Sequence, residues 1–269
     1  MAAALVERMV PEELWTLFQR VVPPAPVRPQ GGGHRRRGDR EVLAAIIFVA
    51  TSGCTWNQLP PGFGLSGVTA FRRFTEWTEA RVWAKLHRLV LDELGARGGL
   101  DWSRCAIDSI SVRALKGQLT GPNPTDRGKK GSKIHLIVDR QGLPLSVGIS
   151  AANLHDSQAL IPLVRGIPPI RSRRGPRRQR PGRLHGEKGY DYRHLRRWLA
   201  SCGIRHRLAR KGIESSRRLG RHRWVVERTV SWLSGCRRLH GRYYERKPEH
   251  FLAFTAIAAT LICHRRLAK

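Results

Sequence analysis

The chain has 269 residues, 41% of them hydrophobic, so it is long and apolar enough to fold around a sizeable core. Lys and Arg number 50 against 20 Asp and Glu, which gives a formal net charge of +30. This excess predicts a polyanionic partner, and it favours DNA or RNA over a membrane surface because no lipidation or signal pattern is present.

The five cysteines and the longest apolar run exclude two further classes of protein. The cysteines contain no CxxC pair, which argues against a zinc ribbon and predicts reduced thiols in a cytoplasmic protein. The run Phe251–Cys263 has 13 residues, too few to span a bilayer, and it is interpreted as a buried helix. The expected location is therefore the cytoplasm.

The first hundred residues carry apolar side chains at helical spacing and are predicted to be all-helical. Asp39 is expected to cap one helix and Gly53 to end it. Residues 27–38, rich in Gly and Arg, are interpreted either as a connector along a phosphate backbone or as a solvated linker. The sequence GARGG at 95–99 predicts a domain boundary, with residues 1–98 on its amino-terminal side. The predicted helices are Pro11–Val22, Arg40–Ser52, Val68–Trp77 and Arg81–Leu94.

The helix Val68–Trp77 is the candidate DNA reader. Ser66 can cap it, and its aromatic side chains are predicted to face inward with Arg72 and Arg73 outside. A helix, a short connection and then a basic helix is the outline of a helix-turn-helix module. Three-helix packing without DNA binding is the alternative interpretation of this pattern.

Beyond residue 99, short alternating or apolar runs predict strands and longer periodic runs predict helices. The predicted order, three strands followed by helix, strand, helix, strand and helix, is that of a ribonuclease H-like fold. The predicted fold class is therefore α+β, an all-helical helix-turn-helix-like domain followed by a mixed-sheet ribonuclease H-like domain at 99–269. The predicted strands are Arg104–Val112, Lys133–Asp139, Leu145–Ala151, Leu184–Gly189 and Ile204–Ala209, and the predicted helices are Ser157–Val164, Tyr190–Ser201, Leu219–Leu239 and Phe251–His264.

Three acidic residues lie on elements that meet at one edge of such a sheet. Asp108 interrupts an apolar strand, where a carboxylate is costly unless it is hydrogen-bonded or binds a cation. Glu187 ends the fourth strand, and Glu227 lies on a late helix. Three carboxylates in one place would form a site for divalent metal. Plainer interpretations are an edge-strand Asp that faces solvent and a surface pair of Arg223 with Glu227.

Two basic segments are candidates for phosphate contacts. The polar loop 116–132 ends in GKKGSK, which places Lys129 and Lys130 near the substrate. Residues 171–183 contain seven arginines and no acid, and they are predicted to form a mobile polycation that binds DNA through counterion release. A solvated insertion that only aids solubility is the alternative.

Several motifs in the same order resemble the DDE transposases of bacterial insertion sequences, in the group named for insertion sequence five. EELW, SGCTWNQLP and FRRFTEW are similar to the amino-terminal domain of that group, and AIDSISVRA, GSKIHLIVD, ANLHD, EKGYD, RWVVERTVSWL, CRRL and YYER to its catalytic domain. The resemblance covers nearly the whole chain, and it implies a bacterial protein associated with the nucleoid. It implies a transposase that binds terminal inverted repeats, cleaves DNA at the ends and joins them to target DNA.

The resemblance also implies that Asp108, Glu187 and Glu227 are the catalytic residues and bind Mg²⁺ or Mn²⁺, as two ions. Glu187 stands where the family string DKGYD has its first Asp, and its carboxylate is expected still to bind metal. Gly220 and Ser234 stand at the Tyr and Lys positions of the signature around the last acid. The implied partner is double-stranded DNA, both element ends and target, bound by a homodimer or larger assembly with no membrane. The residues expected to contact DNA are Arg72, Arg73, Lys129, Lys130, Lys133, Arg173, Arg174, Arg177, Arg178, Lys188 and Arg223.

Two alternative hypotheses remain open. A decayed or repurposed transposase copy that only binds DNA is favoured by the Glu at position 187. A basic structural protein that binds nucleic acid without an active site explains the charge of +30 equally well, but it leaves the placement of the three acids unexplained. A metal-dependent cleavage assay on duplex DNA that carries the element's end separates the transposase from both alternatives.

Overall fold

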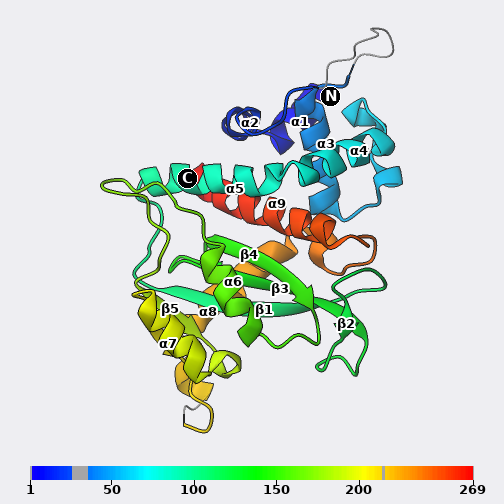
Figure 1. The fold of residues 1–269 in the computed structure, drawn as a ribbon. Coiled ribbons are helices and arrows are strands. Elements are labelled where there is room, and N and C mark those ends of the chain that lie inside the picture. Colours follow the sequence, from blue (N-terminus) through cyan, green and yellow to red (C-terminus); the bar gives the residue numbers. More distant parts are fainter. Residues whose placement is uncertain (1, 26–35, 214–215, 269) are drawn as a thin grey trace.

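The structure, a computed structural model, describes residues 2–25, 36–213 and 216–268, and it describes the backbone alone for residues 2 and 216–223. Most of the basic connector 27–38 thus lies outside the described residues. The described front of the chain is helical, as predicted (Figure 1). Its elements are α1 (Ala2–Met9), α2 (Glu12–Gln19), α3 (Asp39–Ser52), α4 (Gly67–Glu79) and α5 (Val82–Ala96), with short 3-10 helices η1 (Trp56–Gln58) and η2 (Pro61–Phe63).

The caps of these helices follow the predictions at two positions and differ at a third. The Ser66 hydroxyl accepts a hydrogen bond from the Thr69 N–H at 3.2 Å at the start of α4. Gly53 ends α3 in the left-handed conformation, with φ 74°, which glycine adopts without steric cost. The prediction that Asp39 caps α3 is wrong, because Gly38 occupies the cap position and Asp39 is the first helical residue. The sequence did not predict α1.

The back of the chain contains a mixed sheet in the predicted ribonuclease H-like order. The strands lie in the order β4–β3–β1–β5–β6, and β2 pairs with the start of β3. β1 and β4 are antiparallel to β3, whereas β5 is parallel to both β1 and β6. The central strand is therefore β1. The strands are β1 (Cys105–Arg113), β2 (Gly121–Pro122), β3 (Lys130–Val138), β4 (Pro144–Ala151), β5 (Arg183–Gly186) and β6 (Arg205–Leu208).

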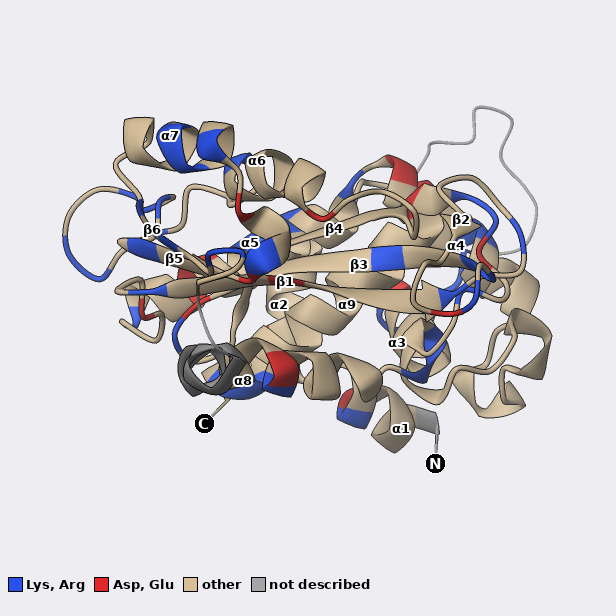
Figure 2. Cartoon of the chain, turned by 90° about the horizontal axis from the view of Figure 1, so that it is seen from below, with Lys and Arg blue, Asp and Glu red and all other residues tan. Residues whose placement is uncertain are grey.

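Helices cover both faces of the sheet (Figures 1 and 2). α6 and α7 lie on one face and α8 lies on the other, while α9 packs against β4, α5, α4 and α3. One apolar core runs through both halves of the chain. The separation of residues 1–98 from 99–269 as domains stays a prediction. The helices are α6 (Ser157–Arg165), α7 (Arg193–Ser201), α8 (Ser216–Ser234) and α9 (Pro248–Leu267), with 3-10 helices η3 (Lys188–Tyr190) and η4 (Arg237–Leu239).

A buried ion pair connects the segment between α8 and α9 to the amino-terminal helices. The side chains of Arg238 and Glu245 are 2% and 3% exposed, and Arg238 Nε lies 2.6 Å from Glu245 Oε1. Arg238 also donates a hydrogen bond to the Cys54 carbonyl at 2.6 Å. The nearby Arg242, which is fully buried, donates to the carbonyl groups of Glu245 and Gln118 at 2.8 and 2.6 Å. These arginines hold a connecting segment in place, a role that the CRRL and YYER motifs did not reveal.

Candidate active site

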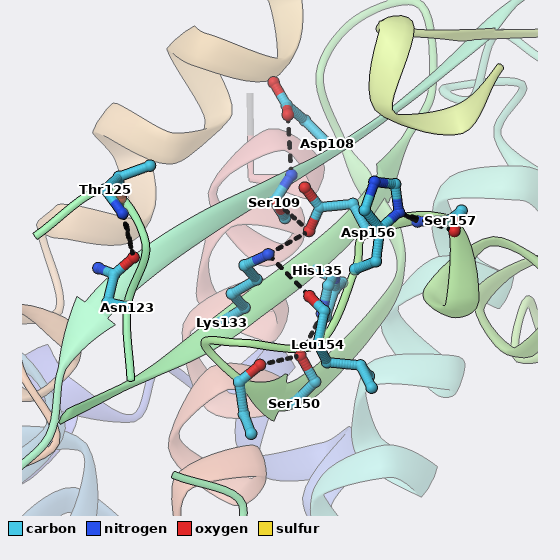
Figure 3. A network of polar contacts seen from close by, with 12 residues as sticks. Asp108, Ser109, Asn123, Thr125, Lys133, His135, Ser150, Leu154, Asp156 and Ser157 are labelled. Atoms are coloured by element: carbon cyan, nitrogen blue, oxygen red, sulfur yellow. Dashed lines mark hydrogen bonds and ion pairs between the residues drawn. The ribbon is translucent and has the colours of Figure 1, made fainter. Parts of the chain in front are cut away.

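Asp108 lies in β1, the central strand of the sheet, so the interpretation of an edge-strand Asp is wrong. Side chains alternate between the two faces of a strand. Asp108 therefore shares the face of its β3 partner Leu136, which α8 covers, and Ser109 shares the opposite face with its partner His135. The Asp108 carboxylate is partly buried, and its Oδ1 accepts a hydrogen bond from the Ser109 N–H at 2.8 Å (Figure 3).

Glu187 follows directly after β5, and the strand register sets it beside Asp108. β1 and β5 pair in parallel, with Ala106 opposite His185. Asp108 and Glu187 are each two residues further along their strands. The backbone of Glu187 is still extended, with φ −78° and ψ −179°, so Glu187 continues the line of β5. Asp108 and Glu187 thus occupy matching positions along two adjacent parallel strands.

Glu227 lies on α8, the helix that covers this face. α8 packs against β1, β3 and β5. Its residues Val225, Val226 and Thr229 are buried, and the Thr229 hydroxyl donates a hydrogen bond to the Gly142 carbonyl at 2.6 Å, which fixes the helix to the β3–β4 turn. The Glu227 side chain is exposed. The three elements that carry the acids therefore pack together.

Metal binding by these acids stays a prediction. Within the part of the chain that the structure describes, no three His, Cys, Asp or Glu side chains stand together as a group that could hold a metal ion. The chemistry of the donor set nevertheless fits Mg²⁺ or Mn²⁺, because both ions prefer oxygen ligands and Asp108, Glu187 and Glu227 supply carboxylates alone.

A polar network lies on the opposite face of β1, directly behind Asp108 (Figure 3). Asp156, next to the start of α6, accepts hydrogen bonds at Oδ1 from the Ser109 hydroxyl and the Lys133 ammonium, both at 2.9 Å. Lys133 also donates to the Leu154 carbonyl at 2.8 Å. The network ties β1, β3 and α6 together at the level of the candidate site, since Ser109 is the residue whose N–H contacts Asp108.

Asp156 also lies close to Glu187. A Cβ atom built on Gly189 would stand 3.5 Å from Glu187 Oε1 and 4.0 Å from Asp156 Cβ, so the turn after Glu187 passes beside Asp156. Sequence reasoning did not select Asp156. The available signal was the ANLHD motif, which ends at this residue just before a predicted helix.

On α4, the structure separates the two arginines that were predicted to contact DNA. Arg72 is exposed. Arg73 is 5% exposed, forms an ion pair with Asp39 of α3, and places its guanidinium carbon 5.3 Å from the ring centroid of Trp77. The prediction that Arg73 faces outward and contacts DNA is therefore wrong, because an acid from another helix holds it in the core.

Lys133 and two arginines of the segment 171–183 are also held by the protein. The Lys133 side chain is 13% exposed and bonded to Asp156, so its ammonium is not the open phosphate contact that was predicted. Arg177 lies 2.8 Å from Asp92 of α5, and the guanidinium of Arg178 lies over the ring of Trp102. These contacts correct the prediction of a mobile polycation, since the segment is anchored to the body of the protein.

The other predicted DNA contacts remain predictions. Lys129 is exposed and lies 4.0 Å from Asp126, and Lys130 is exposed on β3. Lys188 is partly buried in the turn after Glu187. The side chain of Arg223 lies outside what the structure describes. Arg173 and Arg174 are exposed.

Comparison with known proteins identifies the family to which this chain belongs. Residues 102–262 match the family described as "Transposase DDE domain", and the chain belongs to that family. Within it, the chain is of the insertion-sequence kind: residues 10–87 match the family "Putative transposase of IS4/5 family". The sequence motifs predicted a DDE transposase of bacterial insertion sequences, and these matches confirm that family.

Two proteins of Burkholderia cepacia are similar in sequence. The chain is 43% identical over 150 residues to "Putative transposase for insertion sequence element IS402", an overlap of 56% of this chain and 71% of that protein. It is 40% identical over 123 residues to "Insertion element IS402 uncharacterized 16.2 kDa protein", which covers 45% of this chain and 84% of that protein.

The solved structure "Crystal structure of the Mos1 Strand Transfer Complex" matches 90% of this chain and 81% of its own, at 12% identity and a TM-score of 0.26. At that TM-score the two chains do not superpose closely enough to compare sites. In the described parts of the present chain, no helix has both the length and the apolar character needed to cross a membrane.

Proposed function

We propose that this transposase binds the ends of its insertion sequence and catalyses metal-dependent cleavage and joining of DNA strands. The observation that supports the proposal is the parallel pairing of β1, which contains Asp108, with β5, which Glu187 follows directly, together with the packing of α8 against both strands. Glu227 on α8 supplies the third carboxylate. Such a set of acids suits phosphoryl transfer, whose transition state needs its spreading negative charge stabilised.

Asp108, Glu187 and Glu227 are the residues that would hold the metal. When bound, Mg²⁺ supplies Lewis-acid activation of the attacking oxygen and stabilisation of the leaving 3′-oxygen. The protein's own contribution is position: Asp156, to which Lys133 donates, accepts a hydrogen bond from the Ser109 hydroxyl, and the Ser109 N–H holds the Asp108 carboxylate. A carboxylate held in one orientation loses less entropy when it engages its ligand.

Basic residues around the site supply the attraction for DNA. Figure 2 shows Lys and Arg spread over many of the elements and acids at fewer places, in keeping with the net charge of +30. In the proposal, Arg72 on α4 contacts the element's end, and the exposed Lys129, Lys130, Arg173 and Arg174 contact phosphates. Arginine and lysine contacts to phosphate hold a duplex in register without reading its sequence.

Strand cleavage at the element's end should require a divalent metal. The full-length protein is incubated with a duplex that carries the DNA flanking its coding sequence, and the nicked strands are resolved on a denaturing gel. We expect nicks at the end in Mg²⁺ or Mn²⁺ and none with excess EDTA, because carboxylates alone cannot activate the attacking oxygen. A duplex with a scrambled end is the control. Binding of the duplex without cleavage in either metal would support the DNA-binding copy instead.

Shortening Glu187 to Asp should raise the cleavage rate. Glu carries one methylene more than the family's Asp, which displaces the carboxylate by about 1.5 Å, and a displacement of about 1 Å can cost on the order of 10²-fold in rate. Single-turnover cleavage by the wild type and by Glu187→Asp measures the difference. Glu187→Gln, which keeps the length and removes the charge, should lose activity. A slower Glu187→Asp variant would mean that the local backbone is fitted to Glu.

A further inference from the structure

A basic groove of 650 Å³ lies between α5, β4 and α6, away from the three acids. Lys85 and Arg88 of α5 line it, together with Arg81, which stands at the N-cap position just before α5. Lys85 and Arg88 are three residues apart and share one face of the helix, and all three cations are exposed. None of the residues that line the groove is Asp or Glu. Among the described residues, no side chain forms an ion pair or hydrogen bond with these three cations.

Apart from these three cations the groove is uncharged and mostly apolar, with Val147 and Ile149 of β4 and Leu163 of α6 among the residues that line it. Ser146 and Ser150 of β4, together with His135 of β3, add polar groups. The His135 Nε2 lies 2.8 Å from the Ser150 hydroxyl, and burial lowers the pKa of His135 to about 4. Burial likewise lowers the pKa of His87, which lines the groove from α5, to about 4. Both rings are therefore neutral at pH 7, and the groove's charge comes from these three cations.

We propose that this groove, through Arg81, Lys85 and Arg88, binds the phosphate backbone of double-stranded DNA. The proposal rests on the proposed function, which makes DNA the partner. The spacing fits: from Arg81 to Arg88 is seven residues, about 10 Å along a helix. One strand of duplex DNA presents a phosphate about every 3.4 Å along its axis. The three cations thus span roughly the length of three phosphates.

The residues at the two ends of the groove indicate the path that the bound DNA would follow. At one end, Leu154 and Gln158 line it beside Asp156, the residue that ties α6 to Ser109 behind Asp108. At the other end, Gly166 and Pro168 line it just before the arginine segment 171–183, which is anchored to α5 through Asp92. A duplex along the groove would run from the exposed arginines of that segment towards Asp156, on the face of the sheet opposite Asp108.

The salt dependence of DNA binding tests whether the groove contacts DNA phosphates. The full-length triple variant Arg81→Gln/Lys85→Gln/Arg88→Gln is compared with the wild type by fluorescence anisotropy over a range of salt concentrations, on an end-containing and on an unrelated duplex. Neutralising three phosphate contacts should reduce the slope of log K against log salt by about 3, since each contributes about 0.9. We expect the same reduction on both duplexes, because backbone contacts carry no sequence information.

A matched control carries the same charge change elsewhere: Arg8→Gln/Arg193→Gln/Arg197→Gln, at exposed positions outside the groove. It should change the slope by less than about 1. Equal losses in both triple variants, or no loss in the groove variant, overturn the proposal. Loss of self-association with an unchanged DNA slope also overturns it and makes a second copy of the chain the occupant.

The results of this experiment and of the cleavage assay distinguish a failure of the groove proposal from a failure of the proposed function. If the wild type cleaves ends and the groove variant keeps the wild-type slope, the groove proposal fails and the function stands. If the wild type binds DNA without cleaving it and the groove variant loses slope, the function fails and the groove proposal stands. A wild type that binds no duplex overturns both. Circular dichroism spectra and thermal midpoints of the variants confirm that each variant is folded.

Discussion

Replacing Asp108 with Asn is expected to lower the rate of strand cleavage by about 10³-fold, the scale on which loss of one transition-state contact acts in other enzymes. Asn has the same shape, and its carbonyl oxygen can still accept the hydrogen bond from the Ser109 N–H. What it lacks is the negative charge that a divalent metal requires. DNA affinity should be nearly unchanged, because removing a carboxylate makes the surface no less attractive to phosphate. Single-turnover cleavage and a binding isotherm on the same duplex measure the two effects.

The matched control for this experiment is Asp126→Asn. Asp126 lies near Lys129 in the loop before β3, on a different element from the three acids. The Asp126→Asn variant should cleave at the wild-type rate. If Asp108→Asn cleaves as fast as the control, the candidate active site is misplaced. If Asp108→Asn loses DNA binding together with cleavage, the carboxylate has a structural role instead.

The architecture was predictable from the sequence because most helices and strands are indicated by a residue pattern within their own segment. Alternating or apolar runs gave the strands, helical periodicity gave the main helices, and Gly53 and Ser66 marked helix ends that the structure retains. The order of the elements then led to the sheet order around β1. The placement of Asp108, Glu187 and Glu227 on converging elements followed from that order alone. α1 was missed, and β2, with two residues, is too short to carry a periodic signal.

The errors concern contacts between residues far apart in the chain. A basic residue on a helix is ordinarily placed outside, yet Arg73 is buried because Asp39, 34 residues earlier, neutralises it. Lys133 and Asp156 are 23 residues apart, and Arg177 and Asp92 are 85 apart. Periodicity describes one element at a time, so it cannot show which acid of another element will pair with a given cation. At these positions, the pairing of a cation with an acid from a distant element decides whether the cation is buried.

Glu245→Ala is expected to destabilise the fold by about 3–5 kcal/mol, the usual cost of removing one partner of a buried ion pair. Arg238 would keep its hydrogen bond to the Cys54 carbonyl, but its guanidinium would lose the carboxylate that balances its charge. The ring of Tyr244, whose centroid lies 4.3 Å from the Arg238 guanidinium carbon, offers only a weaker cation–π contact. The loss should be visible because the pair joins the segment after α8 to the residues that follow α3.

Urea unfolding followed by circular dichroism measures the free energy of unfolding of the wild type, Glu245→Ala, and the double variant Arg238→Leu/Glu245→Leu. The double variant leaves no buried charge, so it should recover a large part of the stability that the single variant loses. Glu249→Ala, in the first turn of α9, is the control for removing an acid nearby and should cost about 1 kcal/mol or less. A Glu245→Ala variant no less stable than this control, or a double variant less stable than the single, would show that the pair contributes packing and not charge balance.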